Sequence, residues 1–140
     1  MIRFFSEDID FVVSNKAILK KWINNIISIH NAIPGDINII FCSDSYLLSI
    51  NNKYLNHNYY TDIITFDYCE GKRIIGDLFI SIDTVKINSE QYSSDFENEL
   101  HRVIIHGVLH LLGYDDHTEE ETLEMHSLED SSLNILNNVR

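Results

Sequence analysis

The chain has 140 residues, of which 44% are hydrophobic, and its formal net charge is −12 at pH 7. The length fits one domain with one core, and no apolar run is long enough to span a bilayer. The excess of acids argues against a protein that binds long nucleic-acid duplexes through its overall charge, although it does not exclude a nucleic-acid substrate held by a local basic patch. Residues 1–140 are therefore predicted to form a single domain, and the lack of a secretory signal pattern predicts a cytoplasmic location.

The N-terminal part predicts two strands joined by a helix. Ile2–Phe5 is a short apolar run, and Ser14 is the predicted N-cap of a helix over 15–30. Pro34-Gly35-Asp36 predicts a turn, and the apolar run Ile37–Cys42 is typical of a buried strand. A stripe of apolar residues at helical spacing predicts the buried face of the helix: Leu19, Trp22, Ile23, Ile26 and Ile27. Two strands joined through a helix favour a parallel pair.

The middle of the chain predicts a helix followed by a hairpin. The helix begins at Ser43-Asp44 and ends at Asn56-His57-Asn58. One side of it carries the larger side chains Tyr46, Leu47, Ile50 and Tyr54. Two runs rich in β-branched and aromatic residues, Thr61–Tyr68 and Ile74–Ile82, flank a turn and predict antiparallel strands. Cys42 and Cys69 lie in or beside predicted strands, so both are expected to be buried free thiols, and no C-x-x-C spacing supports a thiolate zinc site.

The C-terminal part predicts three helices, the first over 83–91. Ser94-Asp-Phe-Glu97 matches a capping box and begins a second helix that runs to about Leu112, and Gly113 is placed to end it as the C′ residue. Thr118-Glu-Glu-Glu121 is another capping box and begins a last helix through about 136. All elements together predict an α+β domain in which helices pack on a mixed sheet of about four strands.

Two histidines, His106 and His110, lie one helical turn apart in the second of these helices. Side chains four residues apart share a helix face, so both imidazoles can reach one metal ion. Gly113 lets the chain turn back over that face, where Asp116 or His117 can supply a third ligand. Three ligands and an open position are the pattern of a catalytic zinc site. The other histidines of the region, His101 and His126, are expected at the surface.

The spacing can be compared with the metzincin pattern H-E-x-x-H-x-x-G-x-x-H, in which Asp116 takes the last position. The glutamate that serves as the base of those peptidases is replaced by Gly107. A metallopeptidase is therefore disfavoured, and a base has to come from elsewhere. The local candidates are Asp115, Asp116 if it is not a ligand, and the acids 119–121. Further residues that can support the site from the predicted strands are Thr61, Asp62 and Asp77.

The stretch HGVLHLLGYDD resembles the motif H-G-x-L-H-L-x-G-Y-D-H of the YbeY family of bacterial endoribonucleases. TDIITFDY and IIGDLFISIDTV resemble two further segments of that family, and the resemblance covers about 45–130. It implies a zincin-like α+β fold and a zinc-dependent, single-strand-specific endoribonuclease. It also implies action in 3′-end maturation of small-subunit (16S) ribosomal RNA and in ribosome quality control, with the small ribosomal subunit and its assembly proteins as partners.

The chain departs from the family pattern at two positions. The family's third ligand is a histidine directly after Gly-Tyr-Asp, where this chain has Asp116 with His117 next to it. An ungapped comparison favours Asp116, whereas a one-residue insertion favours His117. The family also commonly has arginine directly after the N-x-x-Y tyrosine, and that position is Leu55 here, with Lys53 and His57 as the nearby cations.

The predicted site is thus Zn²⁺ held by His106, His110 and Asp116, with His117 as the alternative ligand. The metal is expected to activate either a water molecule or the RNA's own 2′-hydroxyl. The alternative function, from a different class, is a non-catalytic ribosome-assembly or RNA-binding factor in which zinc only stabilises the loop 113–118.

Overall fold

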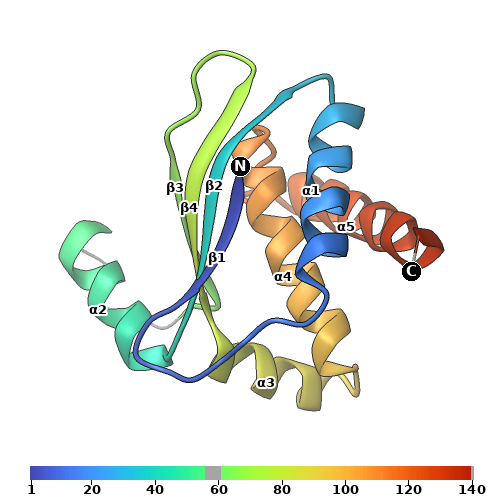
Figure 1. Ribbon diagram of the computed structural model, residues 1–140. Coiled ribbons are helices and arrows are strands. Elements are labelled where there is room, and N and C mark those ends of the chain that lie inside the picture. Colours follow the sequence, from blue (N-terminus) through green and yellow to red (C-terminus); the bar gives the residue numbers. More distant parts are fainter. Residues whose placement is uncertain (56–60, 140) are drawn as a thin grey trace.

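The computed structural model describes residues 1–55 and 61–139, which form one α+β domain around a single sheet (Figure 1). The elements, in chain order, are β1 (Ile2–Ser6), α1 (Lys16–Ile29), β2 (Ile33–Cys42), α2 (Asp44–Leu55), β3 (Ile63–Asp67), β4 (Arg73–Ser81), α3 (Ile82–Gln91), α4 (Phe96–Leu111) and α5 (Glu119–Val139). The predicted fold class is confirmed. No helix in the described ranges is long and apolar enough to cross a membrane.

The sheet has the strand order β1-β2-β4-β3 and is mixed. The strands β1 and β2 are parallel, as the helical connection predicted, and β3 is antiparallel to β4, as the hairpin predicted. The predicted turn at Pro34-Gly35-Asp36 is wrong, because these residues belong to β2, in which Pro34 pairs with Ile74 of β4 and the register shifts between Pro34 and Ile37. A bulge, which kinks a strand without ending it, accounts for the turn-like sequence.

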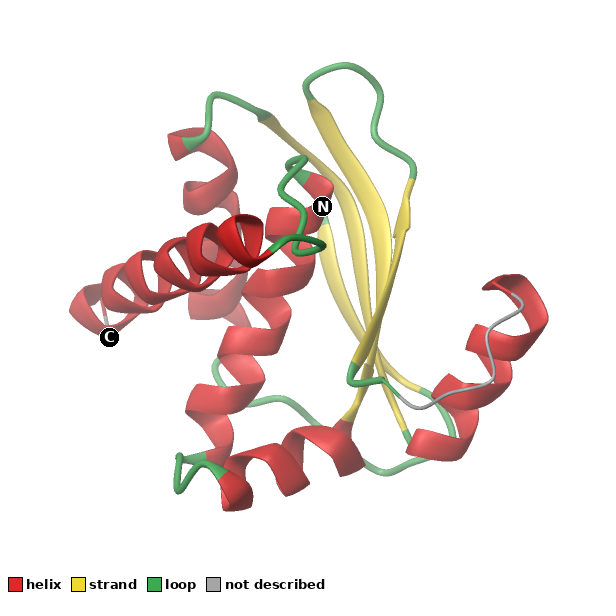
Figure 2. Ribbon diagram, turned by 180° about the vertical axis from the view of Figure 1, so that it is seen from behind, coloured by secondary structure: helices red, strands yellow, loops and turns green. Residues whose placement is uncertain are grey.

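The two faces of the sheet are covered unequally. α1, α4 and α5 lie over one face and α2 lies alone over the other, while α3 follows β4 at one end of the sheet (Figures 1 and 2). The main core lies on the three-helix side and includes the predicted stripe of α1 together with Leu78 and Ile80 of β4. A smaller cluster of Cys42, Leu47, Ile50 and Ile64 lies under α2. Because side chains alternate along a strand, one sheet supplies both clusters.

Two glycines allow α4 to pack closely on the sheet. A Cβ atom on Gly107 of α4 would lie 2.7 Å from Cδ1 of Ile63 and 3.0 Å from both methyl groups of Leu78. A Cβ atom on Gly76 of β4 would lie 2.7 Å from Cδ2 of Leu111. Carbon atoms in ordinary contact are roughly 3.5–4.0 Å apart, so a side chain at either position would force the helix outward. The two glycines therefore set the distance between the sheet and the helix that carries His106 and His110.

Two helix starts differ from the sequence prediction. The N-cap of α1 is Asn15 in the left-handed conformation, with φ 61° and ψ 43°, and not Ser14. The N-cap of α4 is Asp95, whose side chain accepts no capping hydrogen bond, so the predicted capping box beginning at Ser94 is not formed. Several polar residues stand in a row at the start of each of these two helices. The path of the preceding loop determines which of them becomes the N-cap. The end predicted for α2 at 56–58 lies outside the described residues.

His101 is buried and not at the surface as predicted, with a relative exposure of 2%. Its ring lies edge-on to the indole of Trp22, 6.2 Å between centroids. α4 packs against the sheet and also against α1 and α5, so the side of the helix that carries His101 is covered as well. Cys42 is a buried free thiol as predicted, whereas Cys69, which follows β3, is free but only half-buried.

Candidate metal centre

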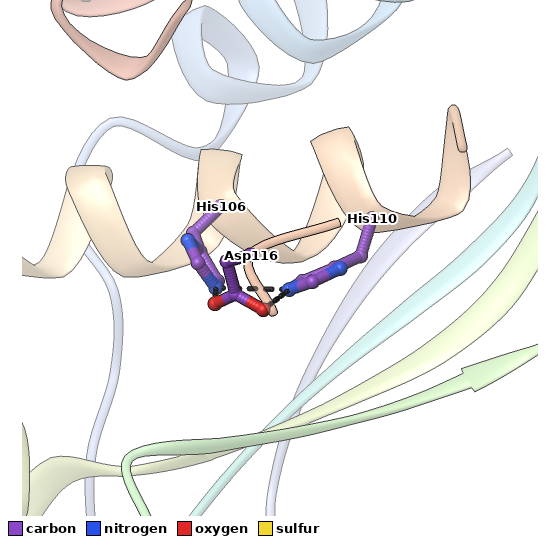
Figure 3. A group of neighbouring side chains, drawn as sticks. All are labelled: His106, His110 and Asp116. Carbon is purple, nitrogen blue, oxygen red and sulfur yellow. Dashed lines mark hydrogen bonds and ion pairs between the residues drawn. The ribbon is translucent and has the colours of Figure 1, made fainter. Parts of the chain in front are cut away.

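The predicted histidine pair lies at the end of α4, and the following loop folds back over it (Figure 3). Gly113 has φ +103° and donates its N–H to the carbonyl of His110, while Tyr114 donates to the carbonyl of Leu109. This pair of bonds is the Schellman motif, in which a left-handed C′ residue reverses the chain at a helix end. Gly113 therefore ends the helix as predicted and returns the chain toward the histidines.

The loop is fixed at its other end by the predicted capping box of α5. The backbone N–H of Thr118 donates to Oε1 of Glu121, and the N–H of Glu121 donates to Oγ1 of Thr118, both at 3.0 Å. Reciprocal bonds of this kind satisfy the first free donors of a helix. The loop 113–118 is thus anchored at both ends, and Asp116 lies in the middle of it.

Three side chains converge beneath this loop. Nε2 of His106 and Nε2 of His110 are 3.0 Å apart. The Asp116 carboxylate places Oδ2 at 3.4 Å from the first nitrogen and Oδ1 at 3.6 Å from the second. In the part of the chain that the structure describes, these three residues are the one group of at least three potential ligands whose donor atoms lie within 4.8 Å of one another.

The donor set fits a zinc ion. Bonds of roughly 2.0–2.1 Å in a tetrahedral site imply donor atoms about 3.3 Å apart. The two nitrogens are 3.0 Å apart, and each lies 3.4 or 3.6 Å from a different oxygen of Asp116. Two imidazoles and one carboxylate form a common ligand set of catalytic zinc sites and leave a fourth position for solvent or substrate. The side chains are about a quarter to a third exposed, so that position is open to solvent.

His117, the alternative third ligand, is exposed and lines the same cleft, but it does not belong to the converging group. The geometry therefore favours Asp116. The ungapped comparison of the sequence motif also placed Asp116 at the ligand position.

The cleft beside the three side chains has a volume of about 420 Å³. Its walls come from α2, from β3 with the residues before it, and from α4 with the following loop. Thr61 and Asp62 line it, as does Leu55, but Asp77 lies on the opposite face of the sheet, where Nδ2 of Asn38 donates to its Oδ1 at 3.0 Å. None of the described residues that line the cleft is lysine or arginine.

A carboxylate that the sequence analysis missed lies behind His106. Glu129 of α5 is 3% exposed, and its Oε2 lies 2.6 Å from Nδ1 of His106. Its Oε1 accepts a hydrogen bond from Nη1 of Arg102 at 2.9 Å, and Nη2 of Arg102 donates to Oδ1 of Asp130 at 2.6 Å. The sequence did contain a signal, because Glu129 stands at helical spacing within the buried stripe of α5: Met125, Glu129, Ser132, Leu133 and Leu136.

Burial and neighbouring charge act in opposite directions on the two histidines. Burial alone would lower the pKa of His106, but the hydrogen bond and charge of Glu129, helped by Asp116, outweigh it and raise that pKa above 6.5. The pKa of His110 is lowered, by burial and then by the neighbouring positive charge of His106. Burial also raises the pKa of the Asp62 carboxyl.

Gly107 explains why the glutamate of the metzincin pattern is missing. The Cβ position faces Ile63 and Leu78 of the sheet, and not the cleft. A glutamate there would be buried against apolar side chains, where an unpaired carboxylate is costly. The close packing of α4 therefore excludes a glutamate base at this position, which is a structural reason for disfavouring a metallopeptidase.

Comparisons with known proteins show the family of the chain. The family model described as Endoribonuclease YbeY matches residues 3–137. The Endoribonuclease YbeY of Parabacteroides distasonis is 47% identical over 135 residues, which cover 96% of this chain and 95% of that protein. The Endoribonuclease YbeY of Bacteroides fragilis is 48% identical over 132 residues, covering 94% and 95%. The solution structure of TM1509 from Thermotoga maritima is similar with a TM-score of 0.68 and 25% identity, over 97% of this chain and 89% of that one. The resemblance inferred from the histidine motif is confirmed, and the chain belongs to the Endoribonuclease YbeY family.

Proposed function

We propose that the protein is a zinc-dependent endoribonuclease that cuts single-stranded RNA and that His106, His110 and Asp116 hold the metal. The observation that carries the proposal is the convergence of two imidazole nitrogens and a carboxylate at an open cleft, in a chain of this family. Small-subunit ribosomal RNA is the proposed substrate, the small ribosomal subunit and its assembly proteins are the proposed partners, and the cytoplasm is the proposed location. These finer assignments rest on the family resemblance.

Zinc at this position would polarise a phosphoryl oxygen and lower the pKa of a coordinated water to about 7. The two histidines supply neutral donors, and Asp116 supplies a negative charge that offsets part of the charge of the cation. Asp62 lines the cleft, and burial raises the pKa of its carboxyl, which makes it the candidate proton-transfer group of the site. Asp62→Asn should therefore lower the cleavage rate without lowering zinc content. Asp67→Asn, at an exposed residue of the same cleft, is the matched control.

The test of the metal site combines metal analysis with cleavage of single-stranded RNA by the wild type, Asp116→Ala and His117→Ala. We expect one zinc per chain in the wild type, loss of zinc and of cleavage in Asp116→Ala, and little change in His117→Ala. The opposite pattern in the two variants would assign the third ligand to His117. A wild type without stoichiometric metal, or a His106→Ala variant that binds metal equally well, would refute the site.

The end groups of the RNA products separate two nucleophiles. A cyclic phosphate end indicates attack by the 2′-hydroxyl of the RNA, whereas a linear phosphate end from the first turnover indicates attack by water. The proposal predicts cleavage in either case, because both reactions would use a metal held by His106, His110 and Asp116.

The non-catalytic alternative is favoured by one observation, the lack of lysine and arginine among the described residues that line the cleft. Zinc removal that melts the protein, together with no RNA cleavage by the zinc-loaded wild type, would support that alternative. Leu55→Arg adds a cation at the cleft wall, and we expect it to strengthen RNA binding and to make binding more sensitive to salt. Tyr54→Arg adds the same charge one residue away at a position that does not line this cleft, and serves as the control.

A further inference from the structure

The Glu129 carboxylate is buried, and its two oxygens are engaged by different partners. Oε2 faces Nδ1 of His106 at 2.6 Å, and Oε1 accepts from Arg102 at 2.9 Å. We infer that Glu129, held by Arg102, is a positioning residue that keeps His106 protonated on Nδ1, so that the lone pair of Nε2 points at His110 and Asp116. This inference rests on the proposed metal site for its purpose, but the protonation pattern can be measured without metal.

The direction of the hydrogen bond follows from the chemistry of the partners. An ionised carboxylate only accepts hydrogen bonds, so Nδ1 of His106 has to be the donor. A neutral imidazole that donates through Nδ1 carries its lone pair on Nε2, which is the atom that faces the other two side chains. Carboxylates that bond the far nitrogen of a ligating histidine orient it and raise its basicity. Glu129 has the position and the charge for that role.

Arg102 fixes which oxygen is available to the histidine. A guanidinium only donates hydrogen bonds, so it occupies Oε1 of Glu129 and leaves Oε2 for His106. Its second nitrogen donates to Asp130, which is exposed on the next position of α5. Asp130 therefore shares the arginine with Glu129 but does not contact the histidine, which makes it a matched control.

The substitution Glu129→Gln converts this arrangement into a sharp test. Glutamine has nearly the same shape but only one acceptor oxygen, and Arg102 requires that oxygen. The amide NH₂ group is then left facing Nδ1 of His106, which has to become the acceptor. The proton moves to Nε2 and points at the metal position. We expect zinc affinity to fall by about 10- to 100-fold, the range found when such supporting groups are removed.

A second substitution should reverse the effect. The double variant Glu129→Gln/Arg102→Met has no arginine to donate to the amide oxygen. That oxygen can therefore turn toward His106 and accept from Nδ1 again. We expect the double variant to recover the Nδ1-protonated form and most of the lost zinc affinity. A purely structural role of the arginine–glutamate pair predicts the opposite, because the double variant would be at least as impaired as Glu129→Gln.

The experiment uses nitrogen-15 imidazole NMR of the metal-free full chain at alkaline pH, together with zinc affinity from competition with a chromogenic chelator. The inference predicts Nδ1–H in the wild type, Asp130→Asn and the double variant, and Nε2–H in Glu129→Gln. It is overturned if Glu129→Gln keeps the Nδ1–H form, or if Asp130→Asn loses as much zinc affinity. If the wild type shows the Nδ1–H form but binds no zinc, the proposed function fails while the positioning remains. If Glu129→Gln does not fold, the double variant decides: recovery of folding with Nδ1–H supports the inference, and Nε2–H refutes it.

Discussion

Gly107→Ala tests whether the close packing of α4 is under steric control. The new Cβ atom would lie 2.7 Å from Cδ1 of Ile63 and 3.0 Å from two carbons of Leu78, each nearly an ångström closer than ordinary contact. Overpacking a core by one methyl group costs about 1–3 kcal/mol. Alanine is at the same time about 1 kcal/mol better than glycine inside a helix. Because Leu78 is fully buried and cannot yield easily, we expect the steric cost to win, with a net loss of about 1 kcal/mol.

The assay is a double-mutant cycle in thermal or urea unfolding. For a chain of this length, the expected loss lowers Tm by about 3–4 °C. Ile63→Val removes the Cδ1 atom that makes the shortest contact, so the double variant should be less destabilised than the sum of the two single variants. If Gly107→Ala raises Tm, as helix propensity alone predicts, or if the two substitutions are additive, the steric account is refuted.

Three further results are expected. Thr118→Ala removes half of the capping box of α5 and should lower stability by about 1 kcal/mol in unfolding experiments, and a neutral result would mean that the box does not stabilise the helix start. Burial, reinforced by the charges of Asp8 and Asp44, raises the pKa of the Cys42 thiol from 9.0 to about 12. Because the folded-state pKa lies above the unfolded one, the stability from this neutral thiol is complete below pH 9.0 and is lost as the pH rises toward about 12. Mass spectrometry after alkylation of the native protein should therefore show Cys69 modified first, and early modification of Cys42 would contradict this. Finally, zinc at about 100 times its Kd should stabilise the fold by about 2.7 kcal/mol, so a chelator should lower Tm by about 9 °C in differential scanning fluorimetry, whereas an unchanged Tm would mean that no metal is bound.

The sequence was most informative where local periodicity decides the structure. The buried stripe of α1 follows from the 3.6-residue repeat, and the buried side chains confirm it. The strands β3 and β4 follow from runs rich in β-branched and aromatic residues, and their antiparallel pairing confirms the predicted hairpin. The histidine pair, Gly113 and Asp116 were also found from sequence, because a helical turn, a left-handed stop and a short loop are all local features.

The sequence was least informative where the answer depends on a neighbour far along the chain. Glu129 meets His106 across 23 positions and two helices, so no local spacing marks the pair. His101 was predicted at the surface but is buried. The periodicity of a helix identifies its apolar side, but it does not show how many neighbouring elements pack around that helix. The turn predicted at Pro34-Gly35-Asp36 failed for a similar reason, since only the partner strand β4 shows that the ladder continues through a bulge.

The helix α5 is the last element of the chain to be synthesised. A chain made from its N-terminus has β1 to α4, and therefore both histidines, before the residues of α5 exist. Glu129, which contacts His106, and the carbonyl of Ser132, which accepts from the indole of Trp22 at 2.8 Å, both belong to this last helix. A nascent chain without α5 thus lacks the carboxylate that contacts His106 and the carbonyl that accepts from Trp22 of α1. The site is complete only once α5 has been made, so a shorter copy carries both histidines without the carboxylate that positions His106.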